Sequence, residues 1–544
     1  MRTLFFFIFI ILGQSYSYGN ASNMHWIEAI TTNADEWGSK VIIDSHNNVY
    51  VYGSFGRGRG GDTLILGTDT IFNIGDDQII LVKYTSSGIL KWAKSIGGNN
   101  INTGQFCDNC EDAYGIHYDS INGAIYLSGL ITGNVQFDSI WVSGYRDNFL
   151  AQLDTLGNFH WVKIFNCPID VDGIKRVITT DLLNNVYCGY NSGNSFTLDN
   201  LTYDPGSYIF KFGSSGAFIS AKNVGSNVII TNLTFYNDSL IMQGFSQSKD
   251  FSIDTLTINS SRKYNIFICK LNLAGNLSWY KLIKSDQNNL QSYNHCLDNM
   301  GNICILGMFY DTVTIGDSVF LSNGSTDIFY VILDISGNYL AIKQLHSTSN
   351  AWPIDVCNAP SGFYFCAKIN GQVQIGDITL ELGSTIAVFR INNTGELIGM
   401  DTFNYHGYPN SILYDKNYYY LLSVIWDPSI IYGFVFPYID GWDLFIAKFD
   451  AITGMPSPKM GTSKLFIYAN PTTGLCNIEI PEEFEHEPQL TLFVYDQTGR
   501  LLKQAEIVME EDRVKLNLEA LAKGMYTAII TNGKKRYSGK IIFQ

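Results

Sequence analysis

The sequence predicts an all-β fold, a seven-bladed β-propeller followed by a small C-terminal β-sandwich of immunoglobulin-like type. Three observations carry this prediction. A short motif that closes on glycine recurs seven times, the repeat region has no apolar period of an amphipathic helix, and the composition changes near residue 460. We expect a signal peptide at 1–19, the propeller at 24–454, a linker at 455–463 and a sorting domain at 464–544.

The recurring motif sets the architecture. Its copies are Lys83–Gly88, Gln152–Gly157, Lys211–Gly216, Lys270–Gly275, Ile332–Gly337, Arg390–Gly395 and Lys448–Gly454. Subtraction places the closing glycines 69, 59, 59, 62, 58 and 59 residues apart. A step of this length indicates stacked copies of one supersecondary unit.

Each copy contains further elements of the same unit. An upstream glycine ends a stretch rich in Val, Ile and Tyr, at Gly53, Gly129, Gly189, Gly244 and Gly307. After the closing glycine comes an apolar stretch that often contains Trp, as in LKWAKSI, FHWVKIF and LSWYKLI. The unit therefore reads as four short strands separated by Gly, Asn, Asp and Ser turns, which is the plan of a propeller blade.

The N-terminal segment completes the count of strands. The seventh copy runs into a Pro/Ser/Gly segment and has no Trp-type strand after it, whereas His25–Ile30 matches that strand at the start of the chain. We therefore expect residues 24–30 to pair with the strand near Leu444–Phe449 and to close the ring. Closure removes the open edges that a linear array would leave.

Composition limits the class of partner. The chain has 544 residues, a net charge of −15 and a pI near 4.9. This acidic composition argues against a nucleic-acid partner, because the phosphate backbone of a nucleic acid binds to a basic protein surface. The nine-residue apolar run LFFFIFIIL after Met1-Arg2-Thr3 suits a cleaved signal peptide, being shorter than the roughly 20 residues of a membrane span. We expect no transmembrane segment.

The last 80 residues differ in charge from the rest. From Ser463 onward 21 of 82 residues are charged, against 64 of 462 before it. This segment resembles the type A C-terminal sorting domain of the type IX secretion system of Bacteroidota. The matching motif residues are Asn470, Pro471, Gly474, Tyr495, Asp496, Gly499, Gly524 and Tyr526, with Ala469 where the family usually has Pro.

That resemblance implies a β-sandwich address that is cleaved as the protein crosses the outer membrane. It implies the type IX secretion machinery and its sortase as partners, and a protein that is secreted or held on the outer cell surface after passing through the periplasm. The repeats, from Met24 to about Gly454, resemble the SBBP-type β-propeller repeats of secreted bacterial proteins. This second resemblance implies a fold and is nearly silent on activity, because propellers host unrelated functions.

No motif in the sequence predicts a catalytic, cofactor-binding or metal-binding residue. Gly56–Gly61 satisfies G-x-G-x-x-G, but a strand follows it where a dinucleotide site needs a helix, so we expect a surface loop. The Asp boxes of sialidase-like propellers are off register, so we expect Trp92, Trp161 and Trp279 to be packing residues. His25 and His160 are expected on exposed strand positions.

The ten cysteines are too sparse for a disulfide scaffold. Bridges Cys296–Cys304 and Cys357–Cys366 stay open as alternatives, but we expect buried free thiols. Cys107 and Cys110, in the extra residues Asn99–Glu111, leave a local disulfide or half a metal site open. Triplets of Asp, Ser/Thr and an aliphatic residue resemble Bacteroidota O-glycosylation sites, although turn-to-strand transitions explain them better; they begin at Asp62, Asp69, Asp119, Asp138, Asp154, Asp238, Asp254, Asp311 and Asp317.

The function expected from these observations is binding. The leading hypothesis is a non-enzymatic binding or adhesion protein that holds a glycan, peptide or protein on the face with the longer loops. The alternative is an extracellular propeller enzyme acting on polysaccharide or peptide, which convergent Asp, Glu or His in the central cavity would favour. A spacer in a surface assembly is the third hypothesis.

Overall fold

The structure is a computed structural model of the whole chain. It describes residues 22–544 except 33, 58–62, 67–68, 73–77, 99–110, 167–176, 289, 323–324, 377, 404, 428, 432–433, 437–440, 454–461, 466, 481–483, 485–489, 497–499, 508–512 and 532–535. This described part contains no α-helix, and its strands run from β1 to β46. The chain divides into a compact unit Asn20–Met455 and a second that contains Pro456–Gln544.

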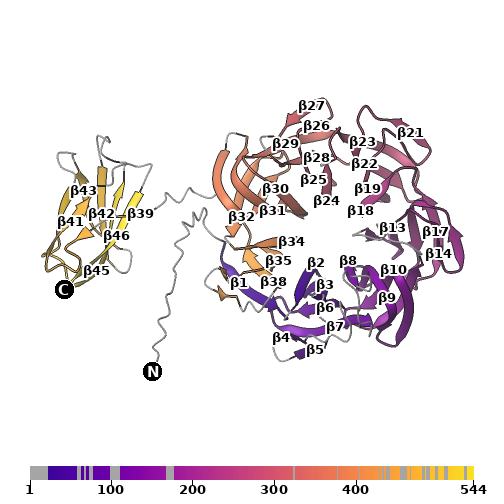
Figure 1. Ribbon diagram of the computed structural model, residues 1–544, viewed down its shortest axis with the longest axis horizontal. Helices are drawn as coiled ribbons and strands as arrows, with labels where there is room; N and C mark the ends of the chain where they lie inside the picture. Colours follow the sequence, from indigo (N-terminus) through magenta and orange to yellow (C-terminus); the bar gives the residue numbers. More distant parts are fainter. Residues whose placement is uncertain are drawn as a thin grey trace, which may run out of the picture. The chain divides into compact units, whose positions relative to one another are not determined.

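The first unit is a ring of seven antiparallel four-stranded blades (Figure 1). The innermost strands of blades one to seven are β2 (Asp35–Ile43), β8 (Asp112–Asp119), β12 (Ile178–Thr180), β18 (Ile229–Tyr236), β24 (Gln291–Leu297), β30 (Ala351–Ala359) and β34 (Gly407–Asp415). The second strands are β3 (Val49–Arg57), β9 (Ala124–Phe137), β13 (Val186–Ser192), β19 (Ser239–Ser246), β25 (Ile303–Phe309), β31 (Gly362–Ile375) and β35 (Tyr418–Ile425).

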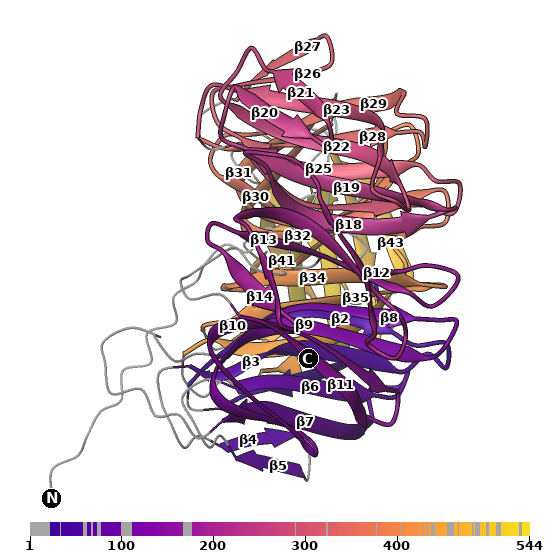
Figure 2. The ribbon, with the colours of Figure 1, turned by 90° about the vertical axis from the view of Figure 1, so that its right-hand side faces the viewer.

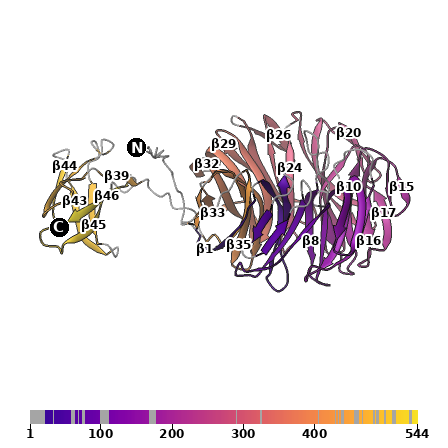
Figure 3. The ribbon, with the colours of Figure 1, turned by 60° about the horizontal axis from the view of Figure 1, so that its bottom comes forward.

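The outer half of each blade follows the same order. The third strands are β6 (Gln78–Tyr84), β10 (Ile140–Asp154), β16 (Gly206–Phe212), β22 (Tyr264–Asn272), β28 (Asp327–Leu333), β32 (Ile378–Asn392) and β38 (Asp443–Asp450). The outermost strands are β7 (Leu90–Gly98), β11 (Phe159–Phe165), β17 (Phe218–Asn223), β23 (Leu277–Ser285), β29 (Tyr339–Ser347), β33 (Leu397–Phe403) and, in blade seven, β1 (Met24–Ile30). Figure 3 shows neighbouring blades packed side by side around the ring.

The ring closes as the sequence predicts. Strand β1 pairs antiparallel with β38, with Ile27 opposite Ala447 and Ile30 opposite Leu444. The resulting sheet has the order β1-β38-β35-β34, so the first strand of the chain completes the last blade. The prediction of seven blades closed by residues 24–30 is confirmed.

In the six described copies the closing glycine of the motif packs closely against the preceding blade. Gly88 has φ +85°, and a Cβ there would lie 2.8 Å from the Trp26 ring of the preceding blade. The Trp26 indole N–H donates to the Ser86 carbonyl at 3.1 Å. Trp161 makes the same contact with the turn around Gly216, so the packing role predicted for the repeat tryptophans is confirmed.

The first residue of the motif also forms hydrogen bonds between neighbouring blades. Lys83 donates to the Thr155 carbonyl of the next blade at 2.7 Å, and Lys448 donates to the Ser86 carbonyl at 3.0 Å. Arg390 donates to the Ile452 carbonyl at 2.5 Å. The motif therefore encodes an inter-blade joint as well as a turn, and this explains why its two ends recur together.

The upstream glycine is required for a different physical reason. The inner strand carries a bulge, with register shifts between Gly38 and Lys40 in blade one and between Ala113 and Gly115 in blade two. The bulge brings an inner-strand carbonyl, that of Trp37 or Asp112, onto the glycine of the second strand. A Cβ at Gly53 or Gly129 would collide with that oxygen, so only glycine fits there.

A hairpin extends each blade beyond its second and third strands. Five blades have it as separate short strands: β4 (Thr63–Leu66) with β5 (Asp69–Phe72), β14 (Phe196–Leu198) with β15 (Leu201–Tyr203), β20 (Asp250–Ile253) with β21 (Leu256–Asn259), β26 (Thr312–Ile315) with β27 (Ser318–Leu321), and β36 (Ile430–Ile431) with β37 (Phe434–Val435). In blades two and six it is the end of the long strands. Several of these hairpins pair with the outer strand of the preceding blade, as β26 does with β23, and Figure 2 shows β4–β5 and β26–β27 at the margin of the ring.

The second unit is a small β-sandwich. One sheet has the order β39-β46-β45-β42-β43 and the other β40-β41-β44. Their bounds are β39 (Thr462–Lys464), β40 (Ile467–Tyr468), β41 (Leu475–Glu479), β42 (Leu490–Tyr495), β43 (Leu501–Ile507), β44 (Arg513–Asn517), β45 (Gly524–Thr531) and β46 (Arg536–Phe543). Leu492, Val494, Leu516 and Ile530 lie in one buried cluster between the sheets, separate from the propeller core.

Candidate functional site

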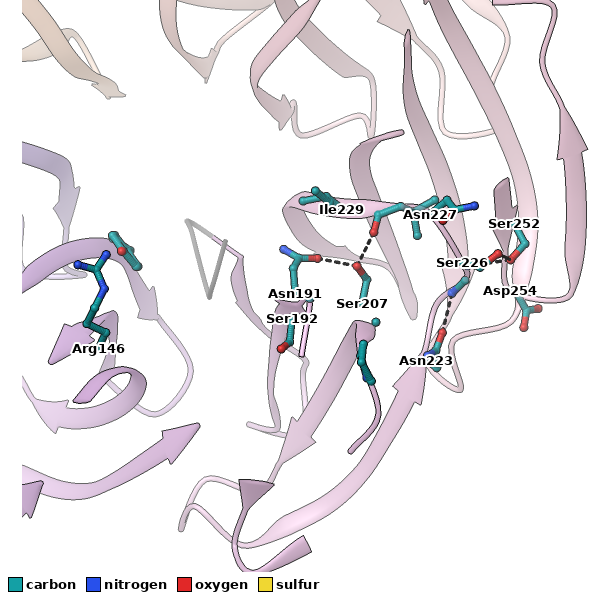
Figure 4. A pocket seen from close by; sticks show the side chains of 16 residues that line it. Arg146, Asn191, Ser192, Ser207, Asn223, Ser226, Asn227, Ile229, Ser252 and Asp254 are labelled. Atoms are coloured by element: carbon teal, nitrogen blue, oxygen red, sulfur yellow. Dashed lines mark hydrogen bonds between the residues drawn. The ribbon is translucent and has the colours of Figure 1, made fainter. Parts of the chain in front are cut away.

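One face of the ring carries the connections from second to third strands and from each outer strand to the next inner strand. We call it the loop face. A cavity of about 1050 Å³ opens there at the junction between blades three and four, here named the polar pocket (Figure 4). It is lined mainly by amide and hydroxyl side chains, among them Asn191, Ser207, Asn223, Ser226 and Ser252.

The wall of the polar pocket is held by hydrogen bonds across the blade junction. Asn191 donates to the Ile230 carbonyl at 2.9 Å and accepts from the Ile230 N–H at 2.8 Å. Ser207 donates to the Val228 carbonyl at 2.6 Å and lies 2.8 Å from the Asn191 side-chain oxygen. Both side chains are buried, so this wall is pre-formed and rigid.

Two charged residues complete the polar pocket. Arg146 of blade two stands on the side opposite Asn191 in Figure 4. Asp254 accepts from the Lys222 ammonium at 2.8 Å, and this bond, more than any other contact, lowers the pKa of the Asp254 carboxyl. The carboxylate is therefore balanced locally, and the pocket presents mostly neutral hydrogen-bonding groups.

A smaller cavity lies at the equivalent position of the next blade junction. A cavity of about 450 Å³ between blades four and five is lined by residues that include Ser246, Asn265 and Ser292. The pair Ser246–Asn265 is in register as Asn191–Ser207 is in blade three. The polar cavity is thus a property of the repeat geometry and of small polar residues placed at it.

Sequence reasoning missed the residue that defines this position. The third strand of every blade carries a buried polar residue at one shared position: Gln78, Asp147, Ser207, Asn265, Asp327, Thr385 and Asp443. It lies five residues before the first residue of the motif, as Gln78 does before Lys83, and four before it in blade three. An alignment of the seven copies upstream of the motif carries this signal.

At the junction between blades seven and one, tryptophan rings stack where the junction between blades three and four has a cavity. The Trp37 and Trp442 rings lie 5.2 Å apart at 31°, and Trp426 lies 5.3 Å from Trp442 at 35°. Beneath them the buried Glu36 carboxyl accepts from Thr32 and lies beside the buried Asp443 carboxyl. Burial, and then Asp443, raises the pKa of Glu36 well above its ordinary value, which favours the protonated carboxyl.

The inner strands carry a buried polar belt. Asp355 accepts from Asn294 at 2.6 Å, from Ser411 at 2.7 Å and from the backbone N–H of Ile412 at 3.2 Å. Its side chain is 1% exposed. It therefore acts as a junction for blades five to seven rather than as an open acid.

Two histidines lie near the same belt. Burial, and then Lys40, lowers the pKa of His117 to about 4 and that of His295 to about 3. Both imidazoles are therefore neutral at physiological pH. Among the described residues no cluster of three His, Cys, Asp or Glu could hold a metal ion.

Other sequence predictions can be located. A strand, β4, follows the Gly56–Gly61 motif as expected, although most of that motif lies outside the described residues. His25 and His160 are exposed as predicted, with side chains 41% and 52% accessible. Cys107, Cys110 and the inserted residues 99–110 also lie outside the described part.

The thiols and the triplets agree with the simpler interpretation. Cys296, Cys304, Cys357 and Cys366 are thiols and not disulfides, so the bridges considered for them do not form. Asp138 and Asp254 sit at positive φ in turns directly before strands β10 and β21, as the turn account of the triplets predicts. Their glycosylation stays a prediction.

The sorting-motif residues gather mainly around one edge of the sandwich. Asn470 donates to the Lys540 carbonyl at 2.7 Å and accepts from the Ile542 N–H at 2.9 Å, next to Pro471. Asp496 accepts from the Arg500 N–H at 3.0 Å at the turn after Tyr495. Tyr526 is buried and donates to the Ala522 carbonyl, Gly524 begins β45, and Gly474 packs on Glu519; Gly499 lies outside the described residues.

Comparisons with solved structures show only low similarity. The chain resembles a member of the DUF4221 family from Bacteroides vulgatus at 11% identity, with 62% of this chain and 93% of that chain covered and a TM-score of 0.31. It resembles a Synechocystis apocarotenoid oxygenase mutant (Glu150Asp) at 11% identity, with 76% and 89% covered and a TM-score of 0.36. No curated protein matches the chain.

The C-terminal unit is the part that a known family covers. Residues 466–544 match the family described as the secretion system C-terminal sorting domain. The resemblance of the repeats to SBBP-type repeats stays a prediction. Among the described residues no helix could cross a membrane. The chain therefore ends in a type IX secretion sorting domain, and the protein is exported to the cell surface or the medium.

Proposed function

We propose that the exported propeller is a non-enzymatic binding protein that holds its ligand in the polar pocket on the loop face. The observation that carries this proposal is the pre-formed cavity of about 1050 Å³ lined by amides and hydroxyls. Such a wall suits a ligand rich in hydroxyl or amide groups, such as a glycan or a peptide backbone, because each buried polar group of the ligand needs a partner.

The enzyme hypothesis has less support. Glycoside hydrolysis by the common route needs two accessible carboxyl groups about 5–10 Å apart. Asp355 and Glu36 are buried and hydrogen-bonded, and Asp254 is tied to Lys222. These are roles in holding the ring together rather than in acid–base chemistry.

The binding proposal is tested with Asn191→Leu and Ser207→Ala in the exported protein. A glycan array and a peptide library are screened for ligands of the native protein, and the two variants are compared with it. Binding should weaken at least tenfold in Asn191→Leu. Hydrolysis of a bound ligand by the native protein would replace the proposal with the enzyme alternative.

The sorting proposal is finer than export itself. We propose that the motif residues Asn470 to Tyr526 serve the secretion machinery and not the propeller fold, and that 1–19 is the signal peptide. Deleting Leu465–Gln544 should leave a folded propeller in the periplasm, measured by cell fractionation and circular dichroism. Normal appearance of that truncation outside the cell would contradict it.

A further inference from the structure

Five aromatic residues gather where blades six, seven and one meet the loop face. We name Trp37, Trp352, Tyr408, Trp426 and Trp442 the aromatic arc. Four of the nine tryptophans, Trp26, Trp92, Trp161 and Trp279, belong to the inter-blade joints. Of the other five, four are in the arc and the fifth, Trp141, lies by itself on the hairpin extension of blade two.

Register shows why the arc is continuous along the inner rim. Trp37 pairs with Ser54, Trp352 with Lys368 and Tyr408 with Val424. In each case the partner follows the upstream glycine or its equivalent, so the three aromatics occupy one position in successive blades. The described residues at that position in blades two, four and five are Asp112, Ile229 and Gln291.

Two rings of the arc are more exposed than core packing requires. Trp37 is 39% exposed and Trp442 is 38% exposed, although both contact other indoles. Trp352, Tyr408 and Trp426 are partly buried and pack against the cores of their blades. Large aromatic rings that stay partly in water are typical of a contact surface.

The groups around the arc accept hydrogen bonds. Asp35 accepts from the Trp442 backbone N–H at 3.0 Å at one end. In the middle of the arc, on blade seven, Asp427 follows Trp426 and lies 2.6 Å from the His406 imidazole, with both side chains exposed. Carboxylates at the rim, on a chain of net charge −15, disfavour polyanions and anionic lipid surfaces.

We propose that the aromatic arc binds the pyranose rings of an uncharged polysaccharide, in addition to the polar pocket. A pyranose has an apolar C–H face that packs on an indole and equatorial hydroxyls that donate to carboxylates at its edge. The arc supplies both groups side by side. This inference deepens the proposed binding function, since it names the ligand class and adds a second contact surface.

The test measures binding of the full exported protein to soluble neutral oligosaccharides, namely cello-, xylo- and mannohexaose, and to alginate and oligogalacturonate as anionic probes. Tryptophan fluorescence and isothermal titration give the affinity. A neutral hexaose should bind, and Trp442→Ala and Trp37→Ala should each weaken it at least tenfold. Trp141→Ala is the matched control and should change it less than twofold.

Stability and specificity have their own controls. The backbone bonds of Trp442 to Asp35 and Glu36 do not involve its ring, so the alanine variant keeps them. Trp442→Phe retains a ring and should bind within about threefold of the native protein. Unchanged circular dichroism confirms that each variant is folded.

The outcomes separate the two surfaces. Neutral-glycan binding that is lost in the arc variants supports the inference, whether or not Asn191→Leu also weakens it. Binding that depends on Asn191 and ignores the arc keeps the polar pocket and overturns the inference. Binding only to anionic probes, only to phosphatidylcholine vesicles, or to none of the hexaoses also overturns it.

Discussion

The junction between blades seven and one and the junction between blades three and four are built on one plan and finished differently. At both, a polar residue starts the third strand: Asp443 in the first and Ser207 in the second. Next to Asp443 in the chain, Trp442 stacks with Trp37 and Trp426, whereas the space above Ser207 is an open cavity. At the first junction the chain runs from β1, the outer strand of blade seven, into β2 of blade one, but β1 joins the rest of blade seven by pairing with β38 and not by a chain connection. There the structure adds apolar contacts and a buried carboxyl pair.

This difference shows how a repeat divides its tasks. In blades one to six the four strands are consecutive in the chain, and their loop-face positions can hold small polar residues. Blade seven has to be held together by side chains and by the pairing of β1 with β38. The following predictions test that division, from the largest expected effect to the smallest.

Deleting Met24–Ile30 behind an intact signal sequence should destabilise the whole ring. Blade seven then loses a paired strand, and Ile27 and Ile30 lose their buried positions. The loss of two aliphatic side chains and the Trp26 contact amounts to about 5 kcal/mol or more. Calorimetry should show a single transition at a markedly lower temperature; an unchanged midpoint would mean that β1 is dispensable.

Substituting one joint tryptophan at each type of junction sharpens the comparison. Trp26→Ala and Trp161→Ala remove the same contact and should each cost about 3–5 kcal/mol. Trp26 also contacts Tyr84 and Tyr420 at the closing junction. We therefore expect Trp26→Ala to lower the denaturant midpoint more; equal shifts would show that blade seven, closed by β1, is no weaker than a blade of consecutive strands.

The carboxyl pair predicts a loss of stability with rising pH. Glu36 has a folded pKa above its ordinary 4.5, so its favourable contribution is complete below about pH 4.5 and is lost as pH rises through the folded pKa. The slope is at most about 1.4 kcal/mol per pH unit for one group. Glu36→Gln mimics the protonated form and should flatten this slope in urea melts between pH 5 and 9.

We expect acid to lower the stability of the ring through two histidines of the inner strands. The lowered pKa of His117 and His295 means that stability is present above about pH 6.5 and is lost as pH falls toward their folded values of about 4 and 3. His117→Gln provides the control for Glu36→Gln. If it flattened the alkaline slope instead, the assignment of the two slopes would be wrong.

Ser207→Ala should have the smallest effect on stability. It removes one hydrogen bond to the Val228 carbonyl and costs about 1 kcal/mol. Ligand binding should suffer more than stability, because the wall of the polar pocket loses a bond that fixes the position of Val228. Thr385→Ala, at the equivalent position in blade six, should cost a similar amount and leave binding unchanged.

The parts that sequence predicts are those that repeat. Seven motifs with Trp26 at the chain start lead directly to seven blades and to the β1–β38 pair, because each copy states the same local geometry. The polar pocket could not be predicted this way. Asn191 and Ser226 are ordinary turn residues in sequence, and only the ring brings Arg146 of blade two opposite them.

The aromatic arc could not be predicted from the sequence either. Trp37 is hundreds of residues away from Trp352 and Tyr408, and their shared position appears only when each inner-strand bulge is in register. The bulge itself is predictable in hindsight, since Gly53 and its equivalents mark where a carbonyl approaches. The exposure of Trp37 and Trp442, which distinguishes them from the joint tryptophans, has no sequence signal.

The position of β38 has a mechanical consequence. The chain leaves the ring at the end of this strand and continues toward the sorting domain, so any pull from the export machinery reaches the ring there. β38 is paired on both sides, with β35 and with β1. A tether pulled at the C-terminal end must therefore tear two ladders of backbone hydrogen bonds at once. The pairing of the N-terminal strand with β38 thus strengthens the point at which a pulling force would reach the folded protein.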